Sequence, residues 1–220
     1  MKRMLVMILY MLVAVQVYGN DTLKVFYRIR LDREIDKAAQ RQMVEGLKKA
    51  ADCEADYILL DLDTYGGAVD EADSIRSAIL RCETPVLAYV NMQAASAGAL
   101  ISIACDSIYM KTGSSIGAAT VVDQSGNVMP DKYQSFMRGM MRSTAQATGR
   151  DPSIAESMTD TANVLSMTPT EAIAVGYCEG IYESEVEVME AIASDKEFTV
   201  RNMEDELTWV DKLIDFLLNP

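Results

Sequence analysis

The feature that most constrains the fold is a near-continuous apolar run over residues 57–62. Such a run is typical of a β-strand that is covered on both faces, as in a parallel sheet. Apolar residues at helical spacing occupy residues 33–52 before it and 68–80 after it, and further candidate strands lie at 24–31 and 85–90. This alternation predicts an α/β fold with repeated strand-helix units and a mainly parallel sheet, and 220 residues suit a single compact domain.

Two loops in this pattern, residues 64–67 and 91–98, follow predicted strands. Ligands of open α/β sheets gather at the carboxyl ends of the strands, so we expect both loops to face one crevice. Downstream, the pattern predicts a strand at 107–110, a loop at 112–117, a hairpin turning at 125–127, a helix over 131–148 ended by Gly149, and a helix from Thr168 to Gly176.

The N-terminus has the pattern of a signal peptide. A basic start over residues 1–3 precedes an apolar run over 4–17 and the small residue Gly19. The apolar run is shorter than the roughly 20 residues that comfortably span a bilayer, which favours cleavage over a retained anchor. We therefore predict a signal peptide over 1–19, one domain over 20–220, and an exported protein that is periplasmic or membrane-associated.

Charge and cysteine content narrow the partners. The net charge of −13 argues against nucleic acid, because phosphate binding draws on clustered Lys and Arg. The four cysteines form no CxxC pair and the chain has no histidine, so we expect no metal site. Cys53 and Cys82 each follow a predicted helix just before a strand, so an exported chain permits a bridge between them. Four free thiols are the alternative.

The absence of histidine also limits the chemistry that is open to a catalytic site. It excludes Ser/His/Asp and Cys/His arrangements. A serine nucleophile would need another base, and lysine is the established substitute. The lysines that follow the candidate serine, Ser96, in the sequence are Lys111, Lys132, Lys196 and Lys212.

Ser96 is the candidate nucleophile because it lies among small residues where a predicted strand ends and a helix begins. A helix start presents free backbone N–H groups, which can stabilise negative charge on a substrate carbonyl together with an N–H from Gly66 and Gly67. The same small-residue run is common where a helix packs closely on a sheet. The pattern alone therefore leaves both interpretations open.

Lys132 is the candidate base, at the start of the helix predicted over 131–148. Lysine has a reference pKa near 10.4, so a lysine that acts as a base must be desolvated. An apolar stripe follows it and could wall such a pocket, although core or subunit interface is the more ordinary role of its residues, Phe136, Met137, Met140 and Met141. The ordinary alternative for Lys132 itself is a surface lysine beside Asp131.

Four separated motifs resemble one family of proteases. They are DTYGG at 63–67, QAASAG at 93–98, SSIGA at 114–118, and PDK at 130–132 with the helix that follows it. From about Leu23 to its C-terminus, the chain resembles the protease domain of NfeD-type membrane-bound serine proteases. That group is related to signal peptide peptidase A and to Clp protease, so the resemblance implies a Clp protease/crotonase-like fold.

The resemblance further implies a serine endopeptidase with a Ser/Lys dyad, in which Ser96 and Lys132 fall on the serine and lysine of the family. It implies an oxyanion hole made by the backbone N–H groups of Gly67 and Ala97, with possible support from Gly66 and Ser115. It also implies no cofactor, a homodimer or larger homo-oligomer, and cleavage of hydrophobic segments in membrane-associated proteins such as stomatin-like partners.

Two features depart from the family pattern. Tyr65 stands where the family has a proline before its two glycines, which should loosen the loop that carries Gly67. Residues 209–220 resemble the segment that in longer members leads into transmembrane helices and a small β-barrel domain, and the sequence stops there. A naturally short form and a truncated one are both consistent with this ending.

Two alternatives remain open at this point. A crotonase-like acyl-CoA enzyme would share the fold and an oxyanion hole of paired N–H groups. An inactive module of the same fold that binds a membrane protein partner is the other, and Tyr65 is the feature that favours it.

Overall fold

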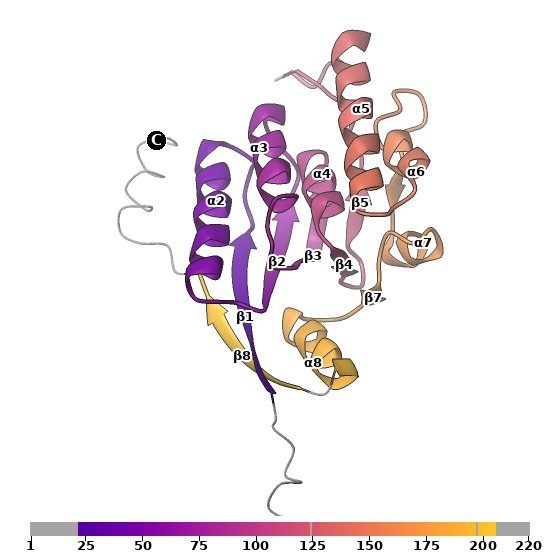
Figure 1. The fold of residues 1–220 in the computed structure, drawn as a ribbon. Helices are drawn as coiled ribbons and strands as arrows, with labels where there is room; N and C mark the ends of the chain where they lie inside the picture. Colours follow the sequence, from indigo (N-terminus) through magenta and orange to yellow (C-terminus); the bar gives the residue numbers. More distant parts are fainter. Residues whose placement is uncertain (1–21, 124, 197, 206–220) are drawn as a thin grey trace, which may run out of the picture.

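The computed structural model describes residues 22–123, 125–196 and 198–205. Within them, an eight-stranded sheet has the order β6-β5-β3-β2-β1-β8, with β4 between β3 and β7 (Figure 1). The strands are β1 (Thr22–Leu31), β2 (Tyr57–Thr64), β3 (Val86–Ala95), β4 (Ser107–Met110), β5 (Ser115–Gly117), β6 (Ser166–Met167), β7 (Gly180–Ile181) and β8 (Phe198–Glu204). The β5–β6 pair is antiparallel and the other pairs are parallel, which confirms the predicted α/β fold.

Helices cover both faces of this sheet. They are α2 (Lys37–Asp52), α3 (Val69–Ile79), α4 (Ala97–Ala104), α5 (Asp131–Ala147), α6 (Pro152–Ser157), α7 (Pro169–Ala174) and α8 (Glu185–Lys196). Alternate residues of β1 point to opposite faces, as a strand requires. Tyr27 and Ile29 join the large core under α2 to α5, whereas Phe26 joins a smaller cluster with Val188 and Met189 of α8.

The helix predicted from residue 33 begins later, at Lys37. The Asp36 side chain caps it by accepting the N–H of Ala39 at 2.8 Å, and capping requires an extended residue before the helix. The residue before the cap, Ile35, pairs with Gly67 in an isolated parallel bridge. The segment predicted as the first helical turn therefore holds one of the two crevice loops.

Strand β3 is longer than predicted and takes up most of the loop expected at residues 91–98. Residues 87–90 pair with β4, and residues 93–95 pair with β5 along the same edge. Of these two partners, β5 lies in the segment that was predicted as a loop at 112–117. It lies on β3 in parallel register, so Ala95 at the end of β3 faces Gly117.

The C-terminal elements α8 and β8 were not predicted. Strand β8 adds to the outer edge of β1 in parallel register, from Thr22 opposite Phe198 to Arg28 opposite Glu204. Arg28 is largely buried and pairs with Asp61, with Glu185 of α8 and with Glu204. These ion pairs hold α8 and β8 to the sheet.

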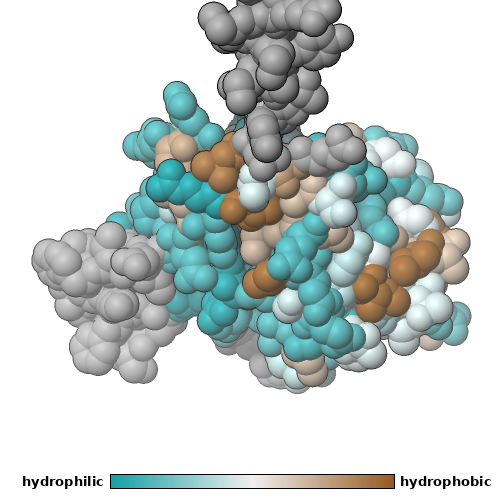
Figure 2. Space-filling view, turned by 90° about the horizontal axis from the view of Figure 1, so that it is seen from below, coloured by the Kyte–Doolittle hydropathy of each residue, from teal (hydrophilic) through white to brown (hydrophobic). Residues whose placement is uncertain are grey.

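Seen from below, where β1 begins, the surface is mainly hydrophilic with separate hydrophobic patches (Figure 2). No helix within the described residues has the length and hydropathy needed to cross a membrane. The predicted signal peptide over 1–19 and the ending over 209–220 lie outside the described residues.

The structure does not bridge the cysteines. Cys53 and Cys82 are half-buried free thiols, and Cys105 and Cys178 are buried free thiols. Burial raises the pKa of the Cys178 thiol to about 11, which disfavours the reactive thiolate. Of the two arrangements that the sequence left open, the structure has the four free thiols.

Candidate active site

Ser96 occupies a sharp turn between β3 and α4. Its backbone has φ 53° and ψ −114°, a region that residues with a side chain rarely adopt and that costs conformational energy. Its N–H donates to the carbonyl of Gly117 at 2.9 Å, and its own carbonyl accepts the N–H of Ala99 at 3.0 Å. The Ser96 hydroxyl makes no capping hydrogen bond to the helix. The turn thus fixes the backbone and leaves Oγ available to a substrate.

The loop over residues 64–67, here called the glycine loop, lies directly against Ser96. A methyl group added at Gly66 would come within 2.7 Å of the Ser96 Cβ and 3.2 Å of its Oγ. The N–H of Ile35 donates to the Gly66 carbonyl, and the N–H of Ala68 donates to the Ile35 carbonyl, both at 2.8 Å. Since successive peptide groups of an extended chain face opposite sides, the Gly67 N–H points away from Ile35. Gly67 has φ +156°, and an added Cβ would collide with the Ile35 backbone.

Thr64 shapes this loop, a role that the sequence analysis missed. Its buried hydroxyl accepts the Gly66 N–H at 3.1 Å and lies 3.3 Å from the Gly66 carbonyl, so it closes a local turn. Its methyl group sits where a Cβ on Gly98 would come within 2.7 Å. Thr64 therefore joins the glycine loop to the first turn of α4, beside Tyr65, which is 83% exposed.

The N–H of Ala97 is the second predicted oxyanion donor. Ala97 is the first residue of α4, and the first N–H groups of a helix have no partner within the helix. Ser115 lies nearby on β5, where its hydroxyl donates to Gln93 Oε1 at 2.8 Å. This hydrogen bond therefore joins β5 to β3, next to the turn at Ser96, whereas Ser115 was predicted as possible support of the oxyanion hole.

A cleft of about 680 Å³ opens at Ser96. One wall comes from the glycine loop and the start of α3, and the other from the segment 118–123 that follows β5. The lining is mainly small or apolar, including Ala95, Ala119 and Met137, with Glu34 and Asp123 among its charged residues. Such a lining suits an extended apolar segment of a peptide.

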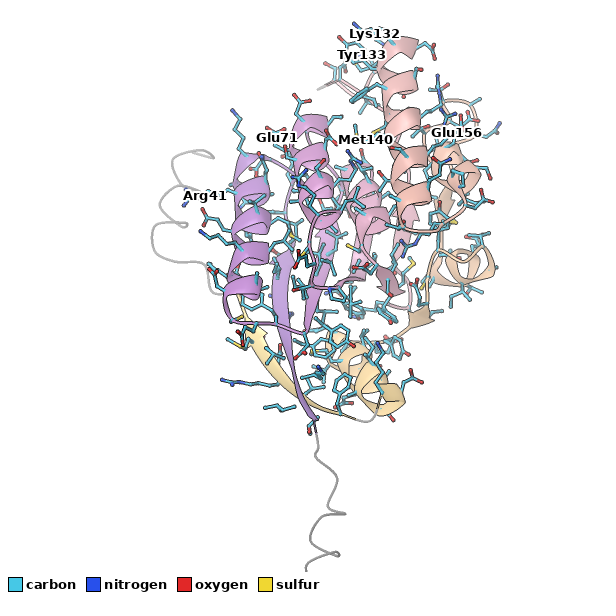
Figure 3. The ribbon with its side chains drawn as sticks, viewed as in Figure 1. Arg41, Glu71, Lys132, Tyr133, Met140 and Glu156 are labelled. Carbon is cyan, nitrogen blue, oxygen red and sulfur yellow. The ribbon has the colours of Figure 1, made fainter. Side chains whose placement is uncertain are left out.

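Lys132 does not contact Ser96 in this arrangement. It is exposed in the first turn of α5 and lines a neighbouring cavity of about 610 Å³ with Tyr133 and Phe136. Figure 3 shows Lys132 and Tyr133 at the free upper end of α5, with Met140 further down the helix. The two cavities share the wall residues Ala68, Val69 and Val121. Of the predicted stripe, Met137, Met140 and Met141 are core residues and Phe136 is 61% exposed.

The far end of α4 is held by a buried arginine. The Arg150 guanidinium donates to the carbonyls of Ile103 and Cys105 at 3.2 and 2.8 Å, and lies 3.5 Å from Glu179. Burial raises the pKa of Glu179. Both ends of the helix that begins at the candidate nucleophile are thereby fixed. In the described part of the chain, no three potential metal ligands of the Cys, Asp and Glu types gather in one place.

Solved structures share this fold. The 1510-N membrane-bound stomatin-specific protease, as a lysine-to-alanine mutant in complex with a substrate peptide, matches with a TM-score of 0.80 at 25% identity, over 90% of this chain and 100% of that chain. A serine-to-alanine mutant of 1510-N matches with a TM-score of 0.76 at 25% identity, over 84% and 100%. ClpP1 from Listeria monocytogenes matches at 0.60 with 19% identity, over 73% and 94%. The fold is therefore the Clp-like fold.

Sequence comparisons identify the family within this fold to which the chain belongs. The chain is 35% identical over 180 residues to membrane protein NfeD1b of Bacillus subtilis (strain 168), covering 77% of this chain and 41% of that protein. It is 35% identical over 133 residues to membrane-bound protease PH1510 of Pyrococcus horikoshii, covering 57% and 30%. The chain thus spans less than half the length of either relative. The model of the NfeD1b N-terminal domain matches residues 25–202, so the chain belongs to the NfeD1b N-terminal domain family.

Proposed function

We propose that this chain is a serine endopeptidase in which Ser96 is the nucleophile and Lys132 is the general base. The observation that carries the proposal is the strained turn at Ser96. The hydroxyl of this residue does not cap α4, and it lies beside Gly66 of the glycine loop. Strain of this kind gathers at functional sites. The similarity to PH1510, whose name describes a membrane-bound protease, supports the same activity.

The proposed reaction joins groups of the Ser96 cleft to Lys132 in the neighbouring cavity. Ser96 Oγ attacks the carbonyl carbon of the scissile peptide bond while Lys132 Nζ accepts the hydroxyl proton. The N–H groups of Gly67 and Ala97 stabilise the negative oxygen of the tetrahedral intermediate. Its collapse breaks the C–N bond, and the leaving amine takes the proton back from Lys132. Water then hydrolyses the ester on Ser96, with Lys132 accepting and returning a proton as before.

Lys132 must be desolvated to act as a base. Because its side chain is exposed, the desolvation must come from a bound peptide or from a second protein chain. A bound peptide that fills both cavities would cover its ammonium group. A second copy of the chain could cover the same apolar surface, so the proposal includes a homodimer or larger assembly. The lysine-to-alanine and serine-to-alanine variants of 1510-N are consistent with a requirement for both residue types.

The proposed substrates are hydrophobic segments of membrane-associated proteins. The mainly apolar cleft lining supports this class, because an extended apolar segment would bury surface there. The 1510-N protease is described as specific for a stomatin homologue, and a stomatin-like protein is therefore the partner proposed for this chain. The proposed location of the protein is outside the cytoplasm, at the membrane or in the periplasm. Both relatives are named as membrane or membrane-bound proteins.

The test is cleavage of apolar peptides by the purified chain, with Ser96→Ala and Lys132→Ala beside it. Each change should abolish cleavage and leave the circular dichroism spectrum unaltered. Ser135→Ala and Lys196→Ala are matched controls, since both residues are exposed and outside the cleft lining. Undiminished cleavage by either dyad variant contradicts the assignment of that residue.

An inactive module that binds a membrane protein is the second candidate. The observation that favours it is the exposed Lys132, which lines a different cavity from Ser96. A fluorophosphonate probe distinguishes the two candidates, because it labels a serine only where the hydroxyl is activated. Peptide binding without labelling of Ser96 would support the module.

A further inference from the structure

The cleft wall and the first turns of α5 are joined by one buried amide. Gln134 is only 2% exposed, and its side chain bonds Val121 in both directions. Gln134 Oε1 accepts the Val121 N–H at 3.1 Å, and Nε2 donates to the Val121 carbonyl at 2.7 Å. Nε2 also donates to the Met129 carbonyl at 3.2 Å. The amide thus bonds the wall as a neighbouring strand would.

These bonds occur where the wall leaves the body of the protein. Earlier wall residues are held from elsewhere: the N–H of Ala118 donates to Leu165, and that of Ala119 donates to Met158. From Val121 onward the chain turns into a hairpin, in which Val122 bridges Val128 and the N–H of Met129 donates to the Val121 carbonyl. Gln134 fastens both strands of this hairpin to α5.

The three hydrogen bonds of the Gln134 amide, here called the Gln134 clasp, matter because of where Val121 lies. Val121 lines the cleft at Ser96 and also the cavity at Lys132. Gln134 lies two residues after Lys132, and Met137, one turn later on the same helix face, lines the cleft as well. One side chain therefore relates the substrate wall to the helix turn that bears the proposed base.

We propose that Gln134 is a positioning residue, which holds the cleft wall and the Lys132 turn as one unit and so sets the geometry between the substrate and the base. The proposal rests on the proposed protease function. The paired donor and acceptor matter because a buried carbonyl or N–H left without its partner is costly. Loss of the clasp would shift the hairpin with respect to α5, and small displacements of catalytic groups reduce rates strongly.

The test uses the full chain with Gln134→Glu and Gln134→Met. The first keeps an acceptor for the Val121 N–H and loses the two donated bonds, and the second loses all three. We expect kcat/KM for an apolar peptide to fall about 10- to 100-fold in both, with kcat itself reduced at temperatures well below the melting point. Gln146→Glu, on the exposed side of α5, is the matched control and should change neither constant.

Hydrogen exchange gives a second readout that does not depend on activity. Amides of residues 118–129 should exchange faster in the Gln134 variants than in the control, while those of the sheet should not change. Unchanged exchange in this segment overturns the clasp, and so does a lowered melting temperature with unaltered kcat and KM. If the wild type cleaves no peptide, the protease proposal fails and exchange alone decides whether Gln134 holds the wall. Gln134→Glu keeps the experiment open if Gln134→Met does not fold.

Discussion

The turn that carries Ser96 is enclosed by the sheet, whereas the helix turn that carries Lys132 projects beyond it. Ser96 is bonded to Gly117 and touched by the glycine loop, and α4 is buried along its whole length. Lys132 is exposed and reaches the cleft only through a shared wall. We infer from this difference that the fold preorganises the proposed nucleophile and oxyanion donors, while the placement of the proposed base depends on one peripheral hairpin and helix.

The largest expected effect breaks the preorganised region. Gly67→Ala should lower kcat about 10²- to 10³-fold, because the new methyl would displace the loop from Ile35 and so move one of the two proposed oxyanion donors. Gly139→Ala in α5 is the control: no atom lies within 4 Å of an added Cβ, and a helical Gly-to-Ala change is stabilising. Peptide kinetics and thermal melts measure both. A normal kcat in Gly67→Ala would show that this loop contributes no donor to an oxyanion hole.

Two residues of α5 carry the same contrast into one helix. Met141 is 0% exposed, so Met141→Ala should reduce the free energy of unfolding by about 2–5 kcal/mol. Phe136, at the projecting end, is 61% exposed, and Phe136→Ala should change it by no more than about 0.5 kcal/mol. Urea denaturation provides both values. A large loss of stability in Phe136→Ala would show that the exposed end is already covered in solution, as by a second copy.

Removing the anchor of α4 should have a smaller effect on stability. Arg150→Met leaves the carbonyls of Ile103 and Cys105 without donors, at an expected cost of about 1–3 kcal/mol. Arg142→Met is the control, since the ion pair of Arg142 with Glu156 is exposed. The melting temperatures of the two variants give the comparison, and equal values would mean that Arg150 does not fix the helix.

The smallest effect is expected at the opposite end of the sheet. Burial alone would raise the pKa of Asp56, but hydrogen bonds from Lys24 and from the Val25 N–H hold it below its usual value. A lowered folded-state pKa stabilises the fold above the unfolded pKa of about 4, and the contribution is lost as the pH falls through the folded value. The melting temperatures of wild type and Asp56→Asn should therefore differ at pH 7 and converge in acid. A difference that does not shrink as the pH falls contradicts this origin.

The sequence predicted the central strands well because their signal is local. Residues 57–62 are apolar on both faces, and residues 168–171 carry the threonine, proline and glutamate of a capped helix, which the structure has as a capping box. The glycine loop and Ser96 were placed at one crevice from strand order alone. The Ser96–Gly66 contact agrees with that prediction.

Errors arose where distant residues decide the local structure. Residues 33–36 fit a helix until the bridge between Ile35 and Gly67 is known, and residues 115–117 look like a loop until they pair with β3. The pairing of β8 with β1 joins positions far apart in the chain, which no local pattern encodes. Gln134 was passed over because a glutamine in a helix gives no sequence signal of its buried bonds.

The pairing of β1 with β8 also sets an order of events during synthesis. Strand β1 leaves the ribosome early, yet its outer edge gains a partner only after residues 198–204 have been made. Until then the edge offers unpaired N–H and C=O groups to any neighbouring chain, which is a route to aggregation. The nascent protein therefore depends on β8 for protection of this edge during folding. Yet β8 lies at the opposite edge of the sheet from the β5–β6 pair, and none of its residues lines the cleft.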